Sequence, residues 1–287
     1  RFEGSISEAV NSGFTLFQLN TPLPRDELRR RFDLSRLVFS RQGFQLAACV
    51  EDLPDKDRLS PLMKAIAGLG ERFSALLLET PDTNEGKQQS GFLRRFAPVL
   101  EDALSKAGLL RGDSPHLPRL HVFLPDSKRA LLGLSLGSEA SAWPMGIPRL
   151  RMPGEAPSRS TLKLAEAILS LLTPEEQKAS LRPGLLAVDL GASPGGWTWQ
   201  LISRGLRVTA IDNGPMAPSL AATGLLEHLR VDGFTWKPRK PVEWMVCDMV
   251  EQPSRIAPLM AEWVASGRCR RSIFNLKLPM KRRHDEI

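Results

Sequence analysis

The chain has 287 residues, of which 42% are hydrophobic and 25% are charged. This length predicts about two domains with their own cores, and the composition excludes collagen-like, disordered and coiled-coil proteins. There is no run of about 18 uncharged apolar residues, so we expect no membrane-spanning helix. Lys and Arg outnumber Asp and Glu by 39 to 32, and the resulting net charge of +7 suggests a polyanionic partner without establishing one.

The positive charge is unevenly distributed. Residues 1–150 hold 20 basic and 18 acidic side chains, whereas residues 151–287 hold 19 and 14. The second half is therefore the better candidate for contact with phosphate. The N-terminus lacks the basic and then apolar segment of a secretion signal, so we expect a cytoplasmic protein. The chain does not begin with Met, which indicates a fragment of a longer product.

Three cysteines, Cys49, Cys247 and Cys269, are far apart in the sequence. No CxxC pair or His cluster accompanies them, which argues against a disulfide framework and a zinc site. We expect three small buried thiols of a reducing compartment.

The first half predicts a mixture of short strands and helices without a chemical motif. We expect strands at 13–19, 38–39 with 45–50, 73–79 and 120–124, and helices over 25–32, from Ser60 onward, and over 91–107. The last helix has a core-facing apolar stripe of Phe92, Phe96, Leu100 and Leu104. Such alternation favours small α+β sandwiches. Four prolines within 143–157 predict a linker there, or an ordered loop lining a cleft between domains.

The second half alternates helices and apolar strands. A helix is expected over 158–172, followed by strands at 185–190, 206–211, 227–231, 243–248 and 271–278, with helices at 195–203, 217–223 and 255–266. Strand, crossover and strand repeated in this way predict an α/β fold with a parallel, doubly wound sheet.

The sharpest motif is Asp189-Leu-Gly-Ala-Ser-Pro-Gly-Gly-Trp197, which follows the first of these strands and opens a helix. Glycines let the backbone approach a ligand, and the N–H groups at a helix start can bind a carboxylate or phosphate. The spacing differs from the dinucleotide-binding fingerprint. It suits a ligand that carries an amino-acid group; the alternative is a tight turn without a ligand.

Asp212 and Asp232 follow the second and third strands. The carboxyl ends of parallel strands line one crevice, where an acid after the second strand can accept both hydroxyls of a ribose. An acid after the third strand can reach an adenine amino group. Taken singly, each could instead be a helix cap or a turn residue.

Three further polar residues are Lys163 on the entry helix, Asp248 at the tip of the fourth strand and Lys277 within the fifth. An unpaired ammonium in the apolar run IFNLKL would be costly, so Lys277 predicts a carboxylate partner, which Asp248 could supply. Low polarity and a nearby cation favour a neutral amine, which can act as a general base. The alternative is a structural ion pair.

These motifs resemble the FtsJ/RrmJ-type RNA ribose 2′-O-methyltransferases. The resemblance rests on MGIPRL, APSRSTLKL, VDLGASPGGWT, DNGPMA, WMVCDMVE and IFNLKLPMK, in this order from Trp143 to Lys281. It is closest to the branch of the family that methylates a cytidine of large-subunit ribosomal RNA. In that branch a ferredoxin-like segment and a THUMP RNA-binding domain come first.

The resemblance implies S-adenosylmethionine as cofactor, no metal, and a Lys-Asp-Lys-Glu catalytic tetrad whose first three members match Lys163, Asp248 and Lys277. The Glu is expected beyond Ile287, together with the last strands of the sheet. The cofactor-binding residues implied are Ser160, Asp189, Gly191, Ala192, Pro194, Gly195, Gly196, Trp197, Asp212, Asp232 and Asp248. The domains implied are 1–52 (ferredoxin-like), 53–142 (THUMP-like), 143–157 (linker) and 158–287 (a Rossmann-like methyltransferase domain).

The expected partner is ribosomal RNA, bound by a monomer. Its phosphates are expected to contact basic residues around the cleft, at positions 151, 159, 237, 239, 240, 281, 282 and 283. Two alternatives remain at this point. One is a small-molecule methyltransferase; the other is a non-catalytic RNA-binding or ribosome assembly factor with a vestigial cofactor pocket.

Overall fold

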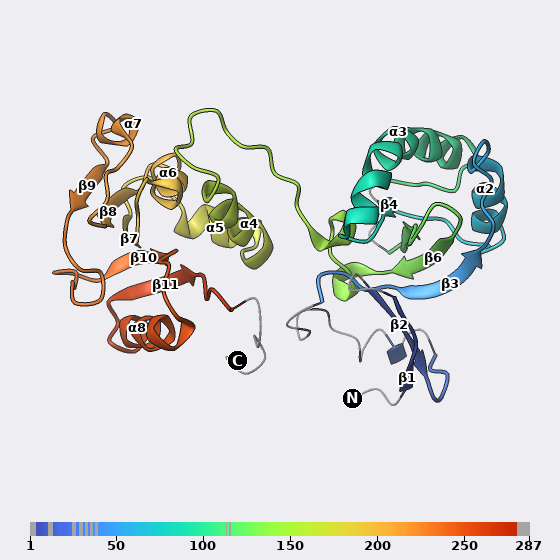
Figure 1. The fold of residues 1–287 in the computed structure, drawn as a ribbon, viewed down its shortest axis with the longest axis horizontal. Helices are drawn as coiled ribbons and strands as arrows, with labels where there is room; N and C mark the ends of the chain where they lie inside the picture. Colours follow the sequence, from blue (N-terminus) through green and yellow to red (C-terminus); the bar gives the residue numbers. More distant parts are fainter. Residues whose placement is uncertain are drawn as a thin grey trace. The chain divides into compact units, whose positions relative to one another are not determined.

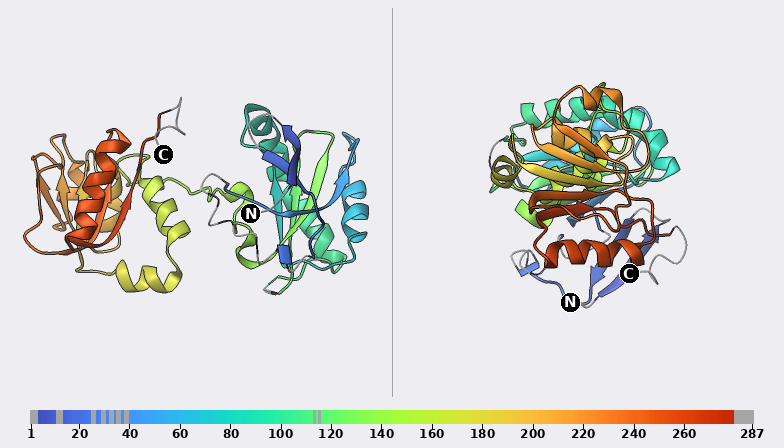
Figure 2. Two further views of the ribbon diagram at one scale, coloured as in Figure 1. Left: turned by 90° about the horizontal axis from the view of Figure 1, so that it is seen from below. Right: turned by 90° about the vertical axis from the view of Figure 1, so that its left-hand side faces the viewer.

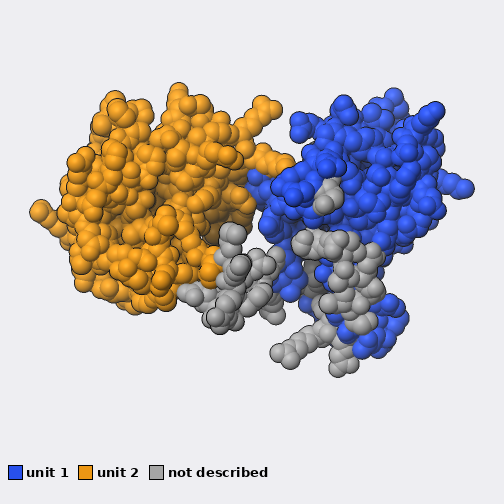
Figure 3. Space-filling model, viewed as in Figure 1, with its two compact units in different colours: residues 1–148 blue, residues 149–287 orange. Residues whose placement is uncertain are grey.

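A computed structural model of the chain describes residues 4–279 apart from 11–13, 25–26, 29–30, 32–33, 35–36, 38–39, 113 and 115. The chain divides into two compact units, residues 1–148 and 149–287 (Figure 3). The division falls inside the proline-rich stretch 143–157. The helix predicted over 25–32 and the short strand at 38–39 lie largely or wholly outside the described residues.

The first unit contains two sheets. One is an antiparallel pair, β1 (Gly4–Val10) and β2 (Phe14–Leu19). The other has the order β3-β6-β5-β4, with only β4 and β5 parallel to each other. Its strands are β3 (Gln45–Val50), β4 (Ala75–Glu79), β5 (Arg119–Phe123) and β6 (Ala130–Ser135). Since β3 pairs with β6, a boundary at residue 52 does not separate two sheets.

Two helices, α2 (Leu59–Ala67) and α3 (Asn84–Lys106), pack against this four-stranded sheet (Figure 1). The α3 stripe is confirmed as core, because Phe96, Leu100 and Leu104 are buried and Phe92 packs against them. The helix begins earlier than predicted, at Asn84, where the Thr83 hydroxyl accepts a hydrogen bond from the Gly86 N–H at 3.1 Å.

The second unit confirms the predicted parallel sheet, in the order β11-β10-β7-β8-β9. Its strands are β7 (Leu186–Leu190), β8 (Arg207–Ile211), β9 (Leu226–Leu229), β10 (Val242–Cys247) and β11 (Cys269–Phe274). The helices are α4 (Thr161–Leu171), α5 (Pro174–Ser180), α6 (Gly196–Ile202), α7 (Pro218–Ala221) and α8 (Pro253–Ala265). Of these elements, α5 was not predicted.

Helices cover both faces of this sheet (Figures 1 and 2). On one face, Leu164 of α4 and Leu201 of α6 join a buried cluster; on the other, Ile256 and Trp263 of α8 join a second. The strands are therefore held in register from both sides, and all of their carboxyl ends reach the same edge. Ligand sites of such sheets lie at this edge.

The cysteine prediction was wrong for Cys49. Cys247 and Cys269 are buried, but Cys49 is exposed because it lies on β3, an edge strand of its sheet. Its Sγ lies 2.9 Å from Oε1 of Glu51. Among the described residues, no helix is long and apolar enough to span a membrane.

Candidate active site

Asp248 comes directly after β10, and two lysines meet it there. Nζ of Lys163, in the first turn of α4, donates to the carboxylate at 3.0 and 3.2 Å. Nζ of Lys277 donates to the main-chain oxygen of Asp248 at 2.7 Å and lies 3.3 Å from its Oδ1. The three residues that the sequence predicted to act together are thus in contact.

The position of Lys277 differs from the prediction. It was placed within a buried strand, but β11 ends at Phe274 and the Lys277 side chain is 29% exposed. The reason is that β10 ends at Cys247, whose carbonyl accepts a last hydrogen bond from the Asn275 N–H at 3.0 Å. Without a partner strand the chain turns, and this turn brings Lys277 to Asp248.

Asn275 is a site residue that sequence reasoning missed. Its Nδ2 donates to Oδ1 of Asp248 at 2.9 Å. The only sequence signal was a polar residue inside the apolar run IFNLKL. Asn275 therefore helps to fix the carboxylate that both lysines share.

The carboxyl of Asp248 is 12% exposed and remains charged. Partial burial acts to raise its pKa, but hydrogen bonds from Asn275 and Lys163 and the charges of both lysines outweigh burial and lower it. The site therefore presents one anion between two cations.

The glycine-rich loop between β7 and α6 has a backbone that only glycine adopts readily. Gly191 has φ +75° and Gly195 has φ +113°. A Cβ on Gly191 would lie 2.5 Å from Cγ of Met249, and one on Gly195 would lie 2.2 Å from Cδ1 of Leu220. The loop is therefore packed closely against the segment that follows Asp248 and against α7.

The start of α4 lies against the same loop. A Cβ on Gly196 would lie 2.2 Å from Oγ of Ser160. The indole Nε1 of Trp197 donates to the Ser160 carbonyl at 3.0 Å, and the Trp197 ring is buried in the core. Ala192 is buried and Pro194 is exposed. The predicted cofactor residues of both segments are thus brought together.

Asp189 is the penultimate residue of β7 and is completely buried. The Thr198 hydroxyl donates to its Oδ2 at 2.7 Å, whereas Oδ1 has no partner among the described residues. Burial raises the pKa of Asp189 to about 7, and the charges of Asp248 and Asp212 add to the rise. These three carboxyl groups therefore lie near one another.

Asp212 and Asp232 both shape loops. Asp212 follows β8 and accepts from the Ser193 N–H at 3.0 Å and the Gly214 N–H at 2.7 Å. This ties it to the glycine-rich loop. Asp232 lies three residues after β9 and accepts from the Phe234 N–H at 2.9 Å, in a turn.

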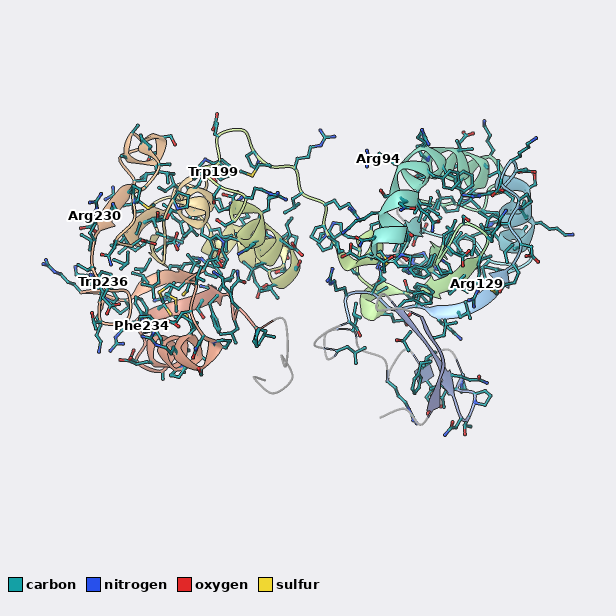
Figure 4. All side chains as sticks on the ribbon, in the orientation of Figure 1. Arg94, Arg129, Trp199, Arg230, Phe234 and Trp236 are labelled. Atoms are coloured by element: carbon teal, nitrogen blue, oxygen red, sulfur yellow. The ribbon has the colours of Figure 1, made fainter. Side chains whose placement is uncertain are left out.

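The basic segment 237–240 does not surround this site, contrary to the prediction. Phe234, which is labelled in Figure 4, lies against Arg255 in the first turn of α8. Lys237 pairs with Glu262 in the last turn of the same helix at 3.2 Å. The chain thus crosses the sheet from the carboxyl end of β9 to the amino end of β10. Positions 281–283 lie outside the described residues. Arg151 and Arg159 lie in the segment that leads into α4.

Comparison with known proteins follows this division of the chain. Residues 57–136 match the family model "Ribosomal RNA large subunit methyltransferase M, N-terminal", and residues 156–261 match "FtsJ-like methyltransferase". A protein from Aromatoleum aromaticum named "Ribosomal RNA large subunit methyltransferase M" is 57% identical to this chain, over 99% of this chain's length and 77% of its own. The chain belongs to the ribosomal RNA large subunit methyltransferase M family.

Other members of the family are similarly close. One from Azoarcus sp. is 56% identical over 99% of this chain and 78% of its own, and one from Methylococcus capsulatus is 50% identical over 99% and 79%. Membership makes the chain a methyltransferase enzyme, and the FtsJ-like match covers α4, the glycine-rich loop and Asp248.

Proposed function

We propose that the chain transfers the methyl group of S-adenosylmethionine to a ribose 2′-hydroxyl of large-subunit ribosomal RNA. The observation that carries this proposal is the contact of Lys163 and Lys277 with the single carboxylate of Asp248. The group lies at the carboxyl edge of a parallel sheet, where such folds bind ligands. Family membership supports the substrate class. Cytidine as the target nucleotide rests on the resemblance alone.

The residues beside Asp248 fit S-adenosylmethionine. Gly191 and Gly195 add no side chain of their own to the loop, so that backbone N–H groups near the start of α6 can approach a ligand. Asp189 holds a buried oxygen without a partner among the described residues, which suits an ammonium or N–H donor. We assign the ribose hydroxyls to Asp212 and the adenine amino group to Asp232. Ser160, Ala192, Pro194, Gly196 and Trp197 complete the proposed set.

When bound, the cofactor supplies an electrophilic methyl group on a sulfonium. The chain must then align the ribose hydroxyl with this methyl and remove its proton. We propose that the amine of Lys277 accepts this proton, after its ammonium has released a proton to water. The positive charge of Lys163 stabilises negative charge that develops on the 2′-oxygen. Asp248, held by Asn275, keeps the two lysines together.

The test is methyl transfer from labelled S-adenosylmethionine to large-subunit ribosomal RNA that lacks the modification. Mass spectrometry then maps the nucleotide, and a chimeric RNA with a 2′-deoxy sugar at that nucleotide is the control. The proposal expects incorporation into the first RNA and none into the chimera. Two results would contradict the proposal. One is no incorporation into either RNA, which is the result expected of an assembly factor or a small-molecule methyltransferase. The other is equal incorporation into both RNAs.

A further inference from the structure

Four cations lie at the edge of the second unit's sheet opposite to Asp248. Arg182 precedes β7, Arg207 is the first residue of β8, and Arg239 and Lys240 precede β10. All four side chains are exposed. We call these four residues the amino-edge row, because every strand of this parallel sheet begins there.

The row is continuous because its strands are neighbours. The order β10-β7-β8 places the three segments side by side, at a spacing of about 4.8 Å per strand. The loops before β7 and β8 are also hydrogen-bonded, since the Gly184 N–H donates to the Gly205 carbonyl at 2.9 Å. Four positive charges are thus gathered on one narrow surface.

Two carboxylates on this side of the unit already have cationic partners. Glu262 binds Lys237 at 3.2 Å and Arg268 at 2.8 Å, and Glu243 binds Arg271. Within the described parts of the chain, no member of the row forms an ion pair with a carboxylate. Clustered like charges repel one another, so the fold gains nothing from this arrangement. A polyanionic partner would compensate the repulsion.

We propose that the amino-edge row binds phosphates of the ribosomal RNA at a distance from the nucleotide being methylated. This rests on the proposed function for its choice of RNA. The six residues of β10 separate the row from Asp248 by roughly 20 Å, at about 3.3 Å per residue. The row therefore holds a part of the RNA that lies outside the catalytic centre, and contributes to affinity rather than to the chemical step.

The experiment compares the whole chain with R239A/K240A and with the charge-retaining exchange R239K/K240R. If the alanine variant leaves two phosphates of single-stranded RNA without a cation, binding weakens by about tenfold at 0.15 M salt and the salt slope falls by about 1.4. We expect these changes in Kd and KM for unmodified large-subunit ribosomal RNA with the alanine variant only. The kcat at saturating RNA stays that of the wild type. Thermal unfolding checks that each variant is folded.

Unchanged RNA affinity and salt slope in R239A/K240A, with an active wild type, would overturn the proposal. So would an equal loss of affinity in R239K/K240R, because charge would then not be the cause. If the wild type binds the RNA but transfers no methyl group, the proposed function fails. The Kd values still test the row in that case.

Discussion

Lys277 is bound to both the main chain and the side chain of Asp248. Its Nζ lies 2.7 Å from the Asp248 carbonyl oxygen and 3.3 Å from Oδ1. The carboxylate also receives Lys163 at 3.0 Å. Because one acid positions two cations, its removal has a larger effect on the site than on the fold.

Asp248→Asn tests this relationship. The substitution keeps the shape of the side chain but removes its charge, so both lysines lose their anionic partner, and Lys277 keeps only its hydrogen bond to the main-chain carbonyl of residue 248. We expect the single-turnover rate of methyl transfer to fall by about 100-fold or more. The unfolding free energy changes by less than about 1 kcal/mol, since Lys163 and Lys277 are 50% and 29% exposed and can be hydrated. A normal rate would contradict the role of the acid.

Asn275→Ala tests whether Asn275 positions this carboxylate. Its hydrogen bond is one cause of the lowered pKa of Asp248, so its loss raises that pKa. The acid limb of the pH–rate profile should therefore move to higher pH, with a rate about tenfold lower at neutral pH. Leu276→Ala is the control, because this neighbouring side chain is 42% exposed. A shift of equal size in both variants would exclude the positioning role.

Asp189→Asn tests the buried acid. Its folded pKa of about 7 lies above the ordinary value of 3.8 for an aspartate, so the folded state holds the proton more tightly than the unfolded state. This proton contributes roughly 2–4 kcal/mol to the free energy of unfolding. The contribution is fully present below pH 4 and is lost as the pH rises to 7. The difference in unfolding free energy between wild type and Asp189→Asn should fall over this window. A constant difference would show that Asp189 is charged throughout.

Gly195→Ala tests the glycine-rich loop. The new Cβ would meet Leu220, and the alanine would have to adopt φ +113°. We expect the free energy of unfolding to fall by about 2–4 kcal/mol and S-adenosylmethionine binding to weaken by tenfold or more. Gly224→Ala is the matched control. Gly224 also has a positive φ, +67°, but nothing lies within 4 Å of the position that a Cβ would take. The free energy of unfolding should therefore fall by only about 1–2 kcal/mol. Calorimetry should find unchanged cofactor affinity in the control; equal losses in both would contradict the account.

Much of the second unit could be predicted because its strands are short apolar runs that alternate with helices. The strand expected at 243–248 was found at Val242–Cys247. The end of β11 could not be predicted, because the apolar run IFNLKL continues beyond the point where β10 stops pairing. Strand length is here set by the neighbouring strand, which local sequence does not encode.

In the first unit, β6 was missed for a related reason. Every residue of Ala130–Ser135 is buried, so its sequence does not alternate between apolar and polar as a half-exposed strand does. Within the site, Asp212, Asp232 and Asp248 could be found from their places after strands, and Lys277 from its place in an apolar run. The contact of Asn275 with Asp248 could not, because it depends on the turn after β11.

The most direct test of the catalytic assignment is the single-turnover rate of Lys277→Ala on unmodified large-subunit ribosomal RNA, with the S-adenosylmethionine Kd measured in parallel. We predict that transfer to the ribose 2′-oxygen is abolished, because no other group is assigned to take the proton. The Kd should stay within a few-fold of the wild type, since Lys277 binds Asp248 rather than the glycine-rich loop. A rate near that of the wild type would contradict the assignment of Lys277 as the base.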